Sequence, residues 1–375
     1  MEAPDRHEIR EIRAFALTQR LPQPSKTSWG SYDAVSIVMV KITTETGLVG
    51  VGEGLARFAP AAFVHLINDA LAPRLMGRDA SAIATHWNAM RRALSGRAGG
   101  VLVEALSAID IALWDILGKA AGLPLYRLLG GTGRTAVPVY AASVGWADDA
   151  AADAAVDQFM ARGFTRMKVK LGAPVDRACR RIERIRARAG DAITLSADAN
   201  WAYSLDEAVT VAAALHANGY EWFEEPLRPE DEGGYRALKA RTDVPLAAGE
   251  SNFTLDEARG LVADGTLSVL QPNVTRSGGI TETRRMAEFA AMHDVAYAPH
   301  NGMSGIVCEV ASLHLAAALP NAAVMECALA PNAFRDGLAD IAPGSARAAG
   351  GTLTCPEGPG LGLEIDWTRL AELAR

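Results

Sequence analysis

Three acidic residues recur at equal spacing in the second half of the sequence. Asp198, Glu224 and Glu250 each follow a short apolar run and stand 26 residues apart (224 − 198 = 26 and 250 − 224 = 26). Carboxylates that meet at one place repel one another and raise one another's pKa, and a hard divalent cation removes that conflict. We therefore predict a Mg2+ site on these residues, in which Mn2+ can substitute. The alternative is a ring of salt bridges with a purely structural role.

Two lysines flank a single valine in "RMKVKLG". Because side chains alternate between the faces of a β-strand, Lys168 and Lys170 are expected to point to the same side. Taken alone, such a pair is more typical of an exposed strand edge, where water screens the repulsion between the ammonium groups. The other polar residues at strand ends favour a place in a reactive site instead.

Further polar side chains follow apolar β-type runs along the same half of the chain. They are Asn200, Glu225, Asn273, Arg276, His300 and Glu326. One such residue usually begins a solvated loop, but a series of them at successive strand ends indicates a shared site. We expect Glu225 to point away from Glu224 and to be structural, because neighbouring residues of a strand face opposite sides.

The elements that would position these residues alternate in type from about residue 136 onward. Eight β-type runs alternate with helical or loop sequence: "VPVYAASVG", "FTRMKVKLG", "AITLSADAN", "YEWFEEP", "VPLAAGES", "LSVLQPN", "VAYAPH" and "AAVMEC". This alternation predicts parallel strands in an α/β fold, and eight units without a dinucleotide motif favour a closed barrel. Active sites of such barrels lie at the C-terminal strand ends, where the polar residues fall. No convincing helix follows the last run.

The rest of the chain predicts a second domain around this barrel. Residues 1–135 read as an α+β domain with a hairpin that turns at "TETG", and residues 136–345 as the barrel. Residues 346–375 are expected to return and pack on the first domain. The polar segment "TQRLPQPSKTSWGSYD" predicts a mobile loop.

Composition limits the class of protein. The chain has 375 residues, 49% apolar and 22% charged, with a net charge of −7, which is typical of a globular protein with a sizeable core. The arginine-rich run "RACRRIERIRARAG" predicts a solvated helix face rather than a nucleic-acid site. The four cysteines form no CxxC pair, and no signal core or membrane-length apolar run is visible, so we expect a reduced, cytoplasmic protein.

Several motifs match a known family in order and spacing. "MKVK", "ADAN", "FEEP", "AGES", "QPNVTRSGGITE" and "APH" resemble the enolase superfamily, specifically its mandelate racemase subgroup, and "GLVGVGEG" resembles the subgroup's capping domain. The resemblance implies an α+β capping domain over a modified TIM barrel, (β/α)7β. It also implies a homo-oligomer, and a reaction that removes the proton α to a carboxylate to form an enediolate stabilised by Mg2+.

The resemblance also implies roles for individual residues. Asp198, Glu224 and Glu250 would bind Mg2+, Lys170 would be the general base, and His300 would face it across the substrate. Three more roles carry over: Glu326 hydrogen-bonds the substrate carboxylate, Asn200 contacts the substrate, and Arg276 pairs with the third metal ligand.

The paired lysines suit this chemistry. A lysine must be neutral to accept a proton, and a second ammonium on the same face lowers its pKa, as does a metal ion. We therefore expect Lys168 to lower the pKa of Lys170 and to pair with the substrate carboxylate.

One position departs from the family pattern. The subgroup usually has an aspartate that hydrogen-bonds the catalytic histidine where this chain has Asn273. An amide orients an imidazole but carries no charge to stabilise imidazolium, so we expect His300 to be a weaker base. A one-base reaction by Lys170, with His300 as an acid or a pocket residue, is therefore favoured over two-base racemisation.

These residues predict a Mg2+-dependent lyase that dehydrates a sugar acid, an aldonate or aldarate, to a 2-keto-3-deoxy acid. The alternatives are a racemase or epimerase, a sugar-acid lactone cycloisomerase, and a barrel kept only for binding. Specificity is expected from the capping domain, through the loop 21–32 and through Arg57 and Phe58, with Arg57 available to bind a second carboxylate.

Overall fold

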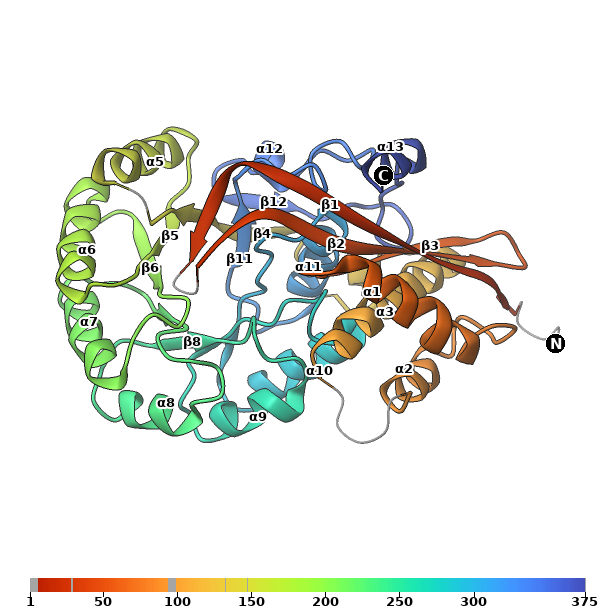
Figure 1. The fold of residues 1–375 in the computed structure, drawn as a ribbon, viewed down its shortest axis with the longest axis horizontal. Helices are drawn as coiled ribbons and strands as arrows, with labels where there is room; N and C mark the ends of the chain where they lie inside the picture. Colours follow the sequence, from red (N-terminus) through yellow and green to blue (C-terminus); the bar gives the residue numbers. More distant parts are fainter. Residues whose placement is uncertain (1–5, 28–29, 94–98, 132, 147, 375) are drawn as a thin grey trace.

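Eight parallel strands form the barrel, within a nine-stranded sheet of the computed structural model, which describes residues 6–27, 30–93, 99–131, 133–146 and 148–374 (Figure 1). The strands are β4 (Ala136–Val144), β5 (Arg166–Lys170), β6 (Thr194–Asp198), β7 (Phe223–Glu224), β8 (Leu246–Ala248), β9 (Val269–Leu270), β10 (Ala296–Tyr297) and β11 (Met325–Ala328). Their spatial order is β10-β9-β8-β7-β6-β5-β4-β11. A parallel bridge between Tyr297 and Ala322 and a hydrogen bond from Glu326 N to Pro299 O (3.2 Å) join its two ends into a barrel.

One helix follows each strand from β4 to β10 in the described part of the chain. They are α5 (Asp149–Ala161), α6 (Val175–Ala189), α7 (Leu205–Ala217), α8 (Glu232–Lys239), α9 (Leu255–Ala263), α10 (Gly279–Ala291) and α11 (Ile306–Ala318). After β11 the next helix is the short α12 (Gly344–Arg347), and β12 (Thr352–Thr354) then pairs with β4. The architecture is therefore (β/α)7β, as predicted.

Small apolar side chains and two large aromatic ones fill the barrel. This inner cluster comprises Tyr140, Ala142, Trp222, Ala247, Val269, Ala298 and Val324. A second, larger apolar cluster lies between the strands and the surrounding helices. The barrel is thus a packed support for the residues at its C-terminal rim.

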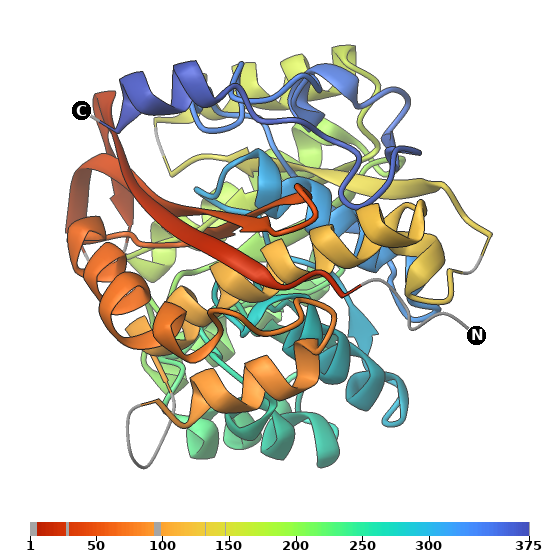
Figure 2. The ribbon, with the colours of Figure 1, turned by 90° about the vertical axis from the view of Figure 1, so that its right-hand side faces the viewer.

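The capping domain is a three-stranded antiparallel sheet with helices. Its strands are β1 (Ile9–Thr27), β2 (Gly30–Thr44) and β3 (Val49–Gly54), in that order, with the predicted "TETG" turn between β2 and β3. Its helices are α1 (Pro60–His65), the short η1 (Leu66–Leu71) and η2 (Ala72–Arg74), α2 (Ile83–Arg91), α3 (Val101–Ala121) and α4 (Leu125–Leu128) (Figure 2). Glycine lets β3 lie directly against α3, since a Cβ on Gly52 would stand 1.8 Å from the Ala108 carbonyl oxygen.

The predicted loop over residues 18–33 is strand in its described part. The backbone continues as strand to Thr27 and again from Gly30, with Ser25 opposite Tyr32, so the segment is the end of a long hairpin; residues 28–29 lie outside the described residues. The ladder shifts register between Arg20 and Ser25, the stretch that holds both prolines. Proline is tolerated there because β1 is an edge strand, whose outer N–H groups need no ladder partner.

The C-terminal segment contacts both domains. Its strand β12 pairs with β4 of the barrel, whereas Leu361 N donates to Asp115 of α3 (2.8 Å). Trp367 in α13 (Trp367–Leu373) packs against Phe15 of β1, with ring centroids 6.1 Å apart. Among the described residues, no helix combines the length and apolar character needed to cross a bilayer.

Helix α6 differs from the predicted solvated face at one position. Ile182 and Ile185 are buried as expected, and Arg184 and Arg188 form exposed ion pairs with Asp153 and Asp157 of α5. Arg181, however, is only 3% exposed. It lies on the buried side of the helix because its guanidinium binds backbone carbonyls at the barrel rim.

Candidate active site

The polar strand ends gather at one rim of the barrel. In the parallel ladders Lys170 is the partner of Asp198, and Asp198 is the partner of Glu224. Glu250 lies two residues beyond the end of β8, the next strand. All three carboxylates are buried. The equal sequence spacing therefore corresponds to neighbouring positions around the rim.

Lys168 is fully buried among carboxylates. Its Nζ lies 2.8 Å from Glu224, 3.5 Å from Asp198 and 3.5 Å from Glu326. Burial alone would lower the pKa of Lys168, but the Glu224 and Glu326 charges outweigh it and hold that pKa well above its usual value. Lys168 is therefore a permanent cation that partners these carboxylates.

Lys170 lies on the same side of β5, as predicted. Its Nζ donates to Asp198 and to Asn200 Oδ1 (2.9 Å). Burial and Lys168 lower the pKa of Lys170, but Asp198, Glu250 and Glu224 outweigh them and raise it. Lys168 thus acts in the predicted direction, and the opposing charges come from the carboxylates that are expected to hold Mg2+.

Asn200 is held toward Lys170 by its backbone. It has a positive φ of 44°, and its N–H donates to Asp198 Oδ1 (2.9 Å). A positive φ is uncommon for a residue with a side chain, and it turns the chain sharply just after β6. This turn brings the amide back over the end of β5, where it can orient the ammonium of Lys170.

His300 lies across the barrel from the lysines and contacts Glu250. Its Nε2 is 2.6 Å from Glu250 Oε2 and 3.6 Å from Glu326 Oε2. Glu250 also lies 3.5 Å from Arg57 Nη2. Burial would raise the pKa of Glu250, but the contact with His300 and the charge of Arg57 hold that pKa well below its usual value.

Asn273 fixes the tautomer of His300. Asn273 Oδ1 accepts from both Thr275 N (2.9 Å) and Thr275 Oγ1 (2.6 Å). This orientation leaves Nδ2 to donate to His300 Nδ1 (3.1 Å). Because Nδ1 accepts, the ring proton resides on Nε2, which then donates to Glu250. The amide therefore favours a ring whose Nε2–H faces Glu250.

Glu326 is anchored by backbone amides. Its Oε2 accepts from Asn301 N (2.9 Å) and Gly302 N (3.2 Å), and Lys168 faces its other oxygen. Burial would raise the pKa of Glu326, but Lys168 and His300 lower it to about 2. The side chain is therefore ionised and accepts hydrogen bonds, whereas its predicted contact with a substrate carboxylate requires a proton on it.

Two basic residues at the edge of the site point to Glu250 and its neighbours. Arg276 donates to the backbone oxygen of Glu250 (3.0 Å) and to Glu104 of α3 (2.9 Å), so it pairs with the main chain of that predicted ligand. Arg57 meets the Glu250 carboxylate itself. The Phe58 side chain is 78% exposed.

Sequence reasoning missed three residues that contact this cluster from inside the barrel. Gln271 donates to Glu224 Oε2 (2.8 Å), and the Trp222 indole lies 3.4 Å from the same oxygen. Tyr140 places its ring 5.5 Å from Lys168 Nζ. Gln271 stands two residues before Asn273, so the period of two could have identified it, whereas Tyr140 lies within a strand and gave no signal.

Glu225 is closer to the cluster than predicted. The strand ends at Glu224 and Glu225 has a φ of +40°, so strict alternation no longer separates the two side chains. Burial and the charges of Glu250 and Asp198 raise the pKa of Glu225 well above its usual value. Its Oε2 is buried without a hydrogen-bond partner among the described residues.

The donor set suits a hard divalent cation, although the residues are ion-paired as they stand. Within the described ranges, no three acidic, histidine or cysteine side chains surround a point with metal-binding geometry. The carboxylates nevertheless interact: burial and Asp198 raise the pKa of Glu224 to about 7. Carboxylate oxygens from three neighbouring strands, with the buried Oε2 of Glu225 beside them, are ligands of the kind that Mg2+ prefers.

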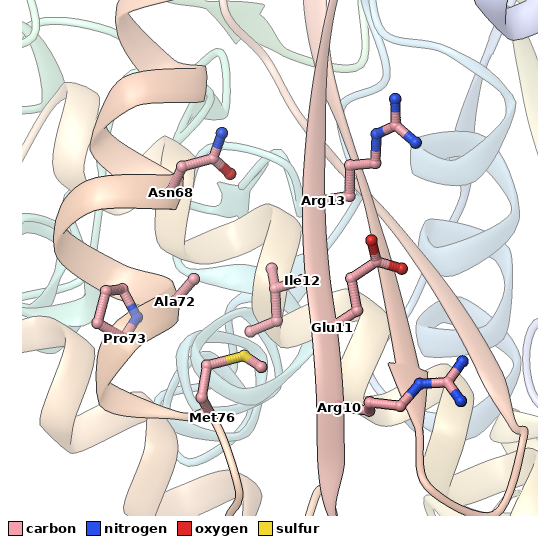
Figure 3. Close-up of a pocket in the computed structure, with 8 residues that line it drawn as sticks. All are labelled: Arg10, Glu11, Ile12, Arg13, Asn68, Ala72, Pro73 and Met76. Carbon is pink, nitrogen blue, oxygen red and sulfur yellow. The ribbon is translucent and has the colours of Figure 1, made fainter.

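A separate groove of about 550 Å3 lies on the capping domain (Figure 3). It runs between β1 and the helical segment around η1 and η2. The residues that line it are Arg10, Glu11, Ile12, Arg13, Asn68, Ala72, Pro73 and Met76. None of the strand-end residues lines this groove, so it is separate from the candidate active site.

Comparison with known proteins agrees with this geometry. D-galactarolactone cycloisomerase of Agrobacterium fabrum is 32% identical over 97% of this chain and 98% of its own length. D-galactonate dehydratase of Verminephrobacter eiseniae is 34% identical over 90% of this chain and 91% of its own length. The crystal structure of a racemase from Streptomyces coelicolor with bound magnesium superposes with a TM-score of 0.87, at 29% identity, over 97% of this chain and 99% of that one.

Two family descriptions cover most of the sequence. Residues 10–130 match the mandelate racemase/muconate lactonizing enzyme N-terminal domain, and residues 150–369 match the enolase C-terminal domain-like family. Together with the (β/α)7β barrel, its capping sheet and the charged rim, these matches identify the chain as a member of the mandelate racemase subgroup of the enolase superfamily.

Proposed function

We propose that this protein removes the proton α to the carboxylate of a sugar acid and then expels the oxygen on the β-carbon. One observation carries the proposal: Lys170 and His300 approach one buried carboxylate cluster from strands on different sides of the barrel. A substrate carbon held between them would have a base on one side and a hydrogen-bond donor on the other. Dehydration to a 2-keto-3-deoxy acid is the first candidate.

Lys170 is the proposed base, and its neighbours prepare it. Asp198, Glu224 and Glu250 would hold Mg2+, whose charge, when bound, would stabilise negative charge developing on the substrate and favour a neutral lysine nearby. Asn200 accepts a hydrogen bond from Lys170 Nζ and so directs the nitrogen. Lys168, which stays charged, binds the substrate carboxylate as negative charge develops on it.

His300 is proposed as a donor to the departing oxygen. Its Nε2–H points into the cluster, and Asn273 Nδ2 occupies the Nδ1 side of the ring. The ring therefore offers a hydrogen bond to the departing oxygen, which takes its proton from solvent, while Lys170 keeps the α-proton and later returns it to solvent. The ring is not arranged to accept a proton from carbon. This arrangement disfavours a two-base racemase or epimerase.

A cycloisomerase is the second candidate, because of the relative that bears that name and matches 97% of this chain. In a cyclic sugar acid the β-oxygen belongs to the ring, so the same elimination opens the ring and loses no water. The two candidates therefore differ in their products: dehydration lowers the mass by one water, whereas ring opening yields an isomer of the substrate.

The capping domain is proposed to contact the far end of the substrate. Arg57 has a buried Nε without a hydrogen-bond partner among the described residues, so it has a donor available for a second carboxylate. Phe58, which is exposed, would cover the substrate. We favour a structural role for Arg276, since its donors already hold Glu104 and the Glu250 backbone.

The proposal is tested with mono- and diacid sugars and their lactones in D2O with Mg2+ or Mn2+. NMR is expected to detect solvent deuterium at the α-carbon or in the 2-keto product, and mass spectrometry distinguishes water loss from isomerisation. Lys170→Ala should lower the rate on the order of a thousandfold, whereas Lys239→Ala on the outer helix α8 should not. Full exchange by Lys170→Ala, or none by wild type across the panel, contradicts the proposal.

A further inference from the structure

Arg181 is the buried arginine of α6, and it reaches the ends of two barrel strands. Its Nε donates to the carbonyl oxygen of Lys170 at the end of β5 (3.2 Å). Its Nη2 donates to the carbonyl of Gly145 and lies 3.5 Å from that of Val144, at the end of β4. The side chain is thus a cross-link between neighbouring strands, on the helix that Figure 1 shows outside β5 and β6.

These carbonyls lie where the ladder between β4 and β5 ends. The last paired positions are Val144 and Val169, so the next carbonyls on both strands need another donor. A buried carbonyl without a donor is costly, and a guanidinium supplies several donors in a fixed plane. On the other side of β5, Leu171 N donates to Asp198 O (2.8 Å). The backbone at Lys170 is therefore held from both sides.

An aromatic ring completes the support. Trp146, just beyond β4, lies 5.4 Å from the Arg181 guanidinium, and a Cβ on Gly172 would come within 3.1 Å of its indole. Trp146 thus packs between α6 and the chain that leaves Lys170. Such contacts leave the end of β5 little freedom to shift.

We propose that Arg181 is a positioning residue for Lys170: its hydrogen bonds to the ends of β4 and β5 fix the backbone that carries the base. This inference rests on the proposed role of Lys170 as the base. Displacement of a reacting group by about 1 Å can cost on the order of 100-fold in rate. Arg181 touches no reacting atom, so its loss acts on the geometry of Lys170.

Arg186, five residues further along the same helix, provides a matched control. It also donates to backbone carbonyls, those of Asn218 (2.9 Å) and Ile193 (2.8 Å), but these lie at the opposite end of the barrel. Loss of either arginine removes carbonyl partners and should lower the melting temperature. Only loss of Arg181 should disturb Lys170.

The test compares Arg181→Met, Arg181→Lys and Arg186→Met with wild type. For the α-proton exchange reaction, Arg181→Met should lower kcat roughly 10- to 100-fold with KM within about twofold. Arg181→Lys keeps one donor group and should be intermediate, and it carries the test if the methionine variant does not fold. Arg186→Met should keep the wild-type kcat. Equal kcat in Arg181→Met and wild type, or an equal loss in Arg186→Met, overturns the proposal.

A second measurement needs no substrate. Amide hydrogen exchange of the peptide 166–172 should be faster in both Arg181 variants and unchanged in Arg186→Met. Unchanged exchange in the Arg181 variants overturns the positioning role. If the peptide loosens but wild type exchanges no α-proton of any sugar acid, the anchor stands and the proposed function fails.

Discussion

At the scale of single residues, the feature that most distinguishes this site is the amide at position 273. Thr275 donates twice to Asn273 Oδ1, which leaves Nδ2 facing the Nδ1 atom of His300. A carboxylate there would accept from Nδ1–H and stabilise imidazolium, but the amide does neither. The side chain at position 273 thus decides whether His300 gives a hydrogen bond or takes a proton.

Asn273→Asp should convert His300 into a second base. Nδ1 would then carry a proton and Nε2 would be free to accept one from carbon. We expect wild type to exchange the α-proton of one epimer only. The variant should exchange the α-protons of both epimers, and its exchange rate for the second epimer should exceed that of wild type by at least about tenfold. Proton NMR in D2O with paired epimers measures this. Asn273→Ala is the control, and a gain in it, or none in the aspartate variant, contradicts the assignment.

At the scale of elements, the capping domain is fixed to the barrel through α3. Asp110 of α3 accepts from Thr281 N (2.9 Å) and Thr281 Oγ1 (2.6 Å) at the start of α10, and Ser107 accepts from Gly278 N (2.9 Å). Arg276 continues this contact from Glu104 to the backbone of Glu250. The packing of α3 therefore bears on the position of a proposed metal ligand.

Asp110 should make stability depend on pH. Burial raises its pKa from 3.8 to about 7 in the folded chain, although Thr281 opposes the shift. Because the pKa of Asp110 is higher in the folded chain than in the unfolded chain, its protonated carboxyl stabilises the fold. That stabilisation is complete below the pKa of the unfolded chain and is lost as the pH rises through about 7. The amide of Asp110→Asn cannot titrate. The free energy of unfolding of this variant, relative to that of wild type, should therefore rise by up to about 4 kcal/mol between pH 4 and pH 8.

Denaturant unfolding at several pH values measures this difference. Asp191→Asn, which removes an exposed carboxyl before β6 instead of a buried one, is the control. If the difference between wild type and Asp110→Asn stays constant from pH 4 to pH 8, the buried carboxyl does not titrate as stated.

The contact between β3 and α3 should tolerate no added atom. A Cβ on Gly52 would overlap the Ala108 carbonyl oxygen, which belongs to a helix backbone and cannot rotate away. We expect Gly52→Ala to destabilise the fold by about 3 kcal/mol or more. Gly145→Ala, where a Cβ meets nothing within 4 Å, should change stability little. Thermal unfolding of both variants checks this, and equal melting temperatures contradict it.

At the scale of the whole molecule, metal binding should couple to stability. A ligand that binds only the folded chain stabilises it by about 2.7 kcal/mol at 100 times its dissociation constant. We expect millimolar Mg2+ to raise the melting temperature by a few degrees, and Glu224→Gln to lose most of that response. Glu221→Gln is the control, since Glu221 pairs with Arg166 near the other end of the same strands (2.7 Å). An equal response in both variants contradicts the site.

The order of strands and helices was readable from the sequence because it depends on local patterns. All eight predicted β-type runs form strands, and the 26-residue spacing places Asp198, Glu224 and the region of Glu250 on neighbouring strands. A period of two and a barrel topology are enough to bring Lys168 and Lys170 toward these carboxylates. The absence of a long helix directly after β11 was also predicted, because it too depends on a local pattern.

Other features were decided only by the tertiary structure, because they depend on partners distant in the sequence. The side of α6 on which Arg181 lies is set by carbonyls of β4 and β5, and the orientation of Asn273 by how its amide meets Thr275 and His300. The net pKa shift of Lys170 sums charges from four strands. Local periodicity places a side chain on a face, but only the folded chain determines which atoms meet it there.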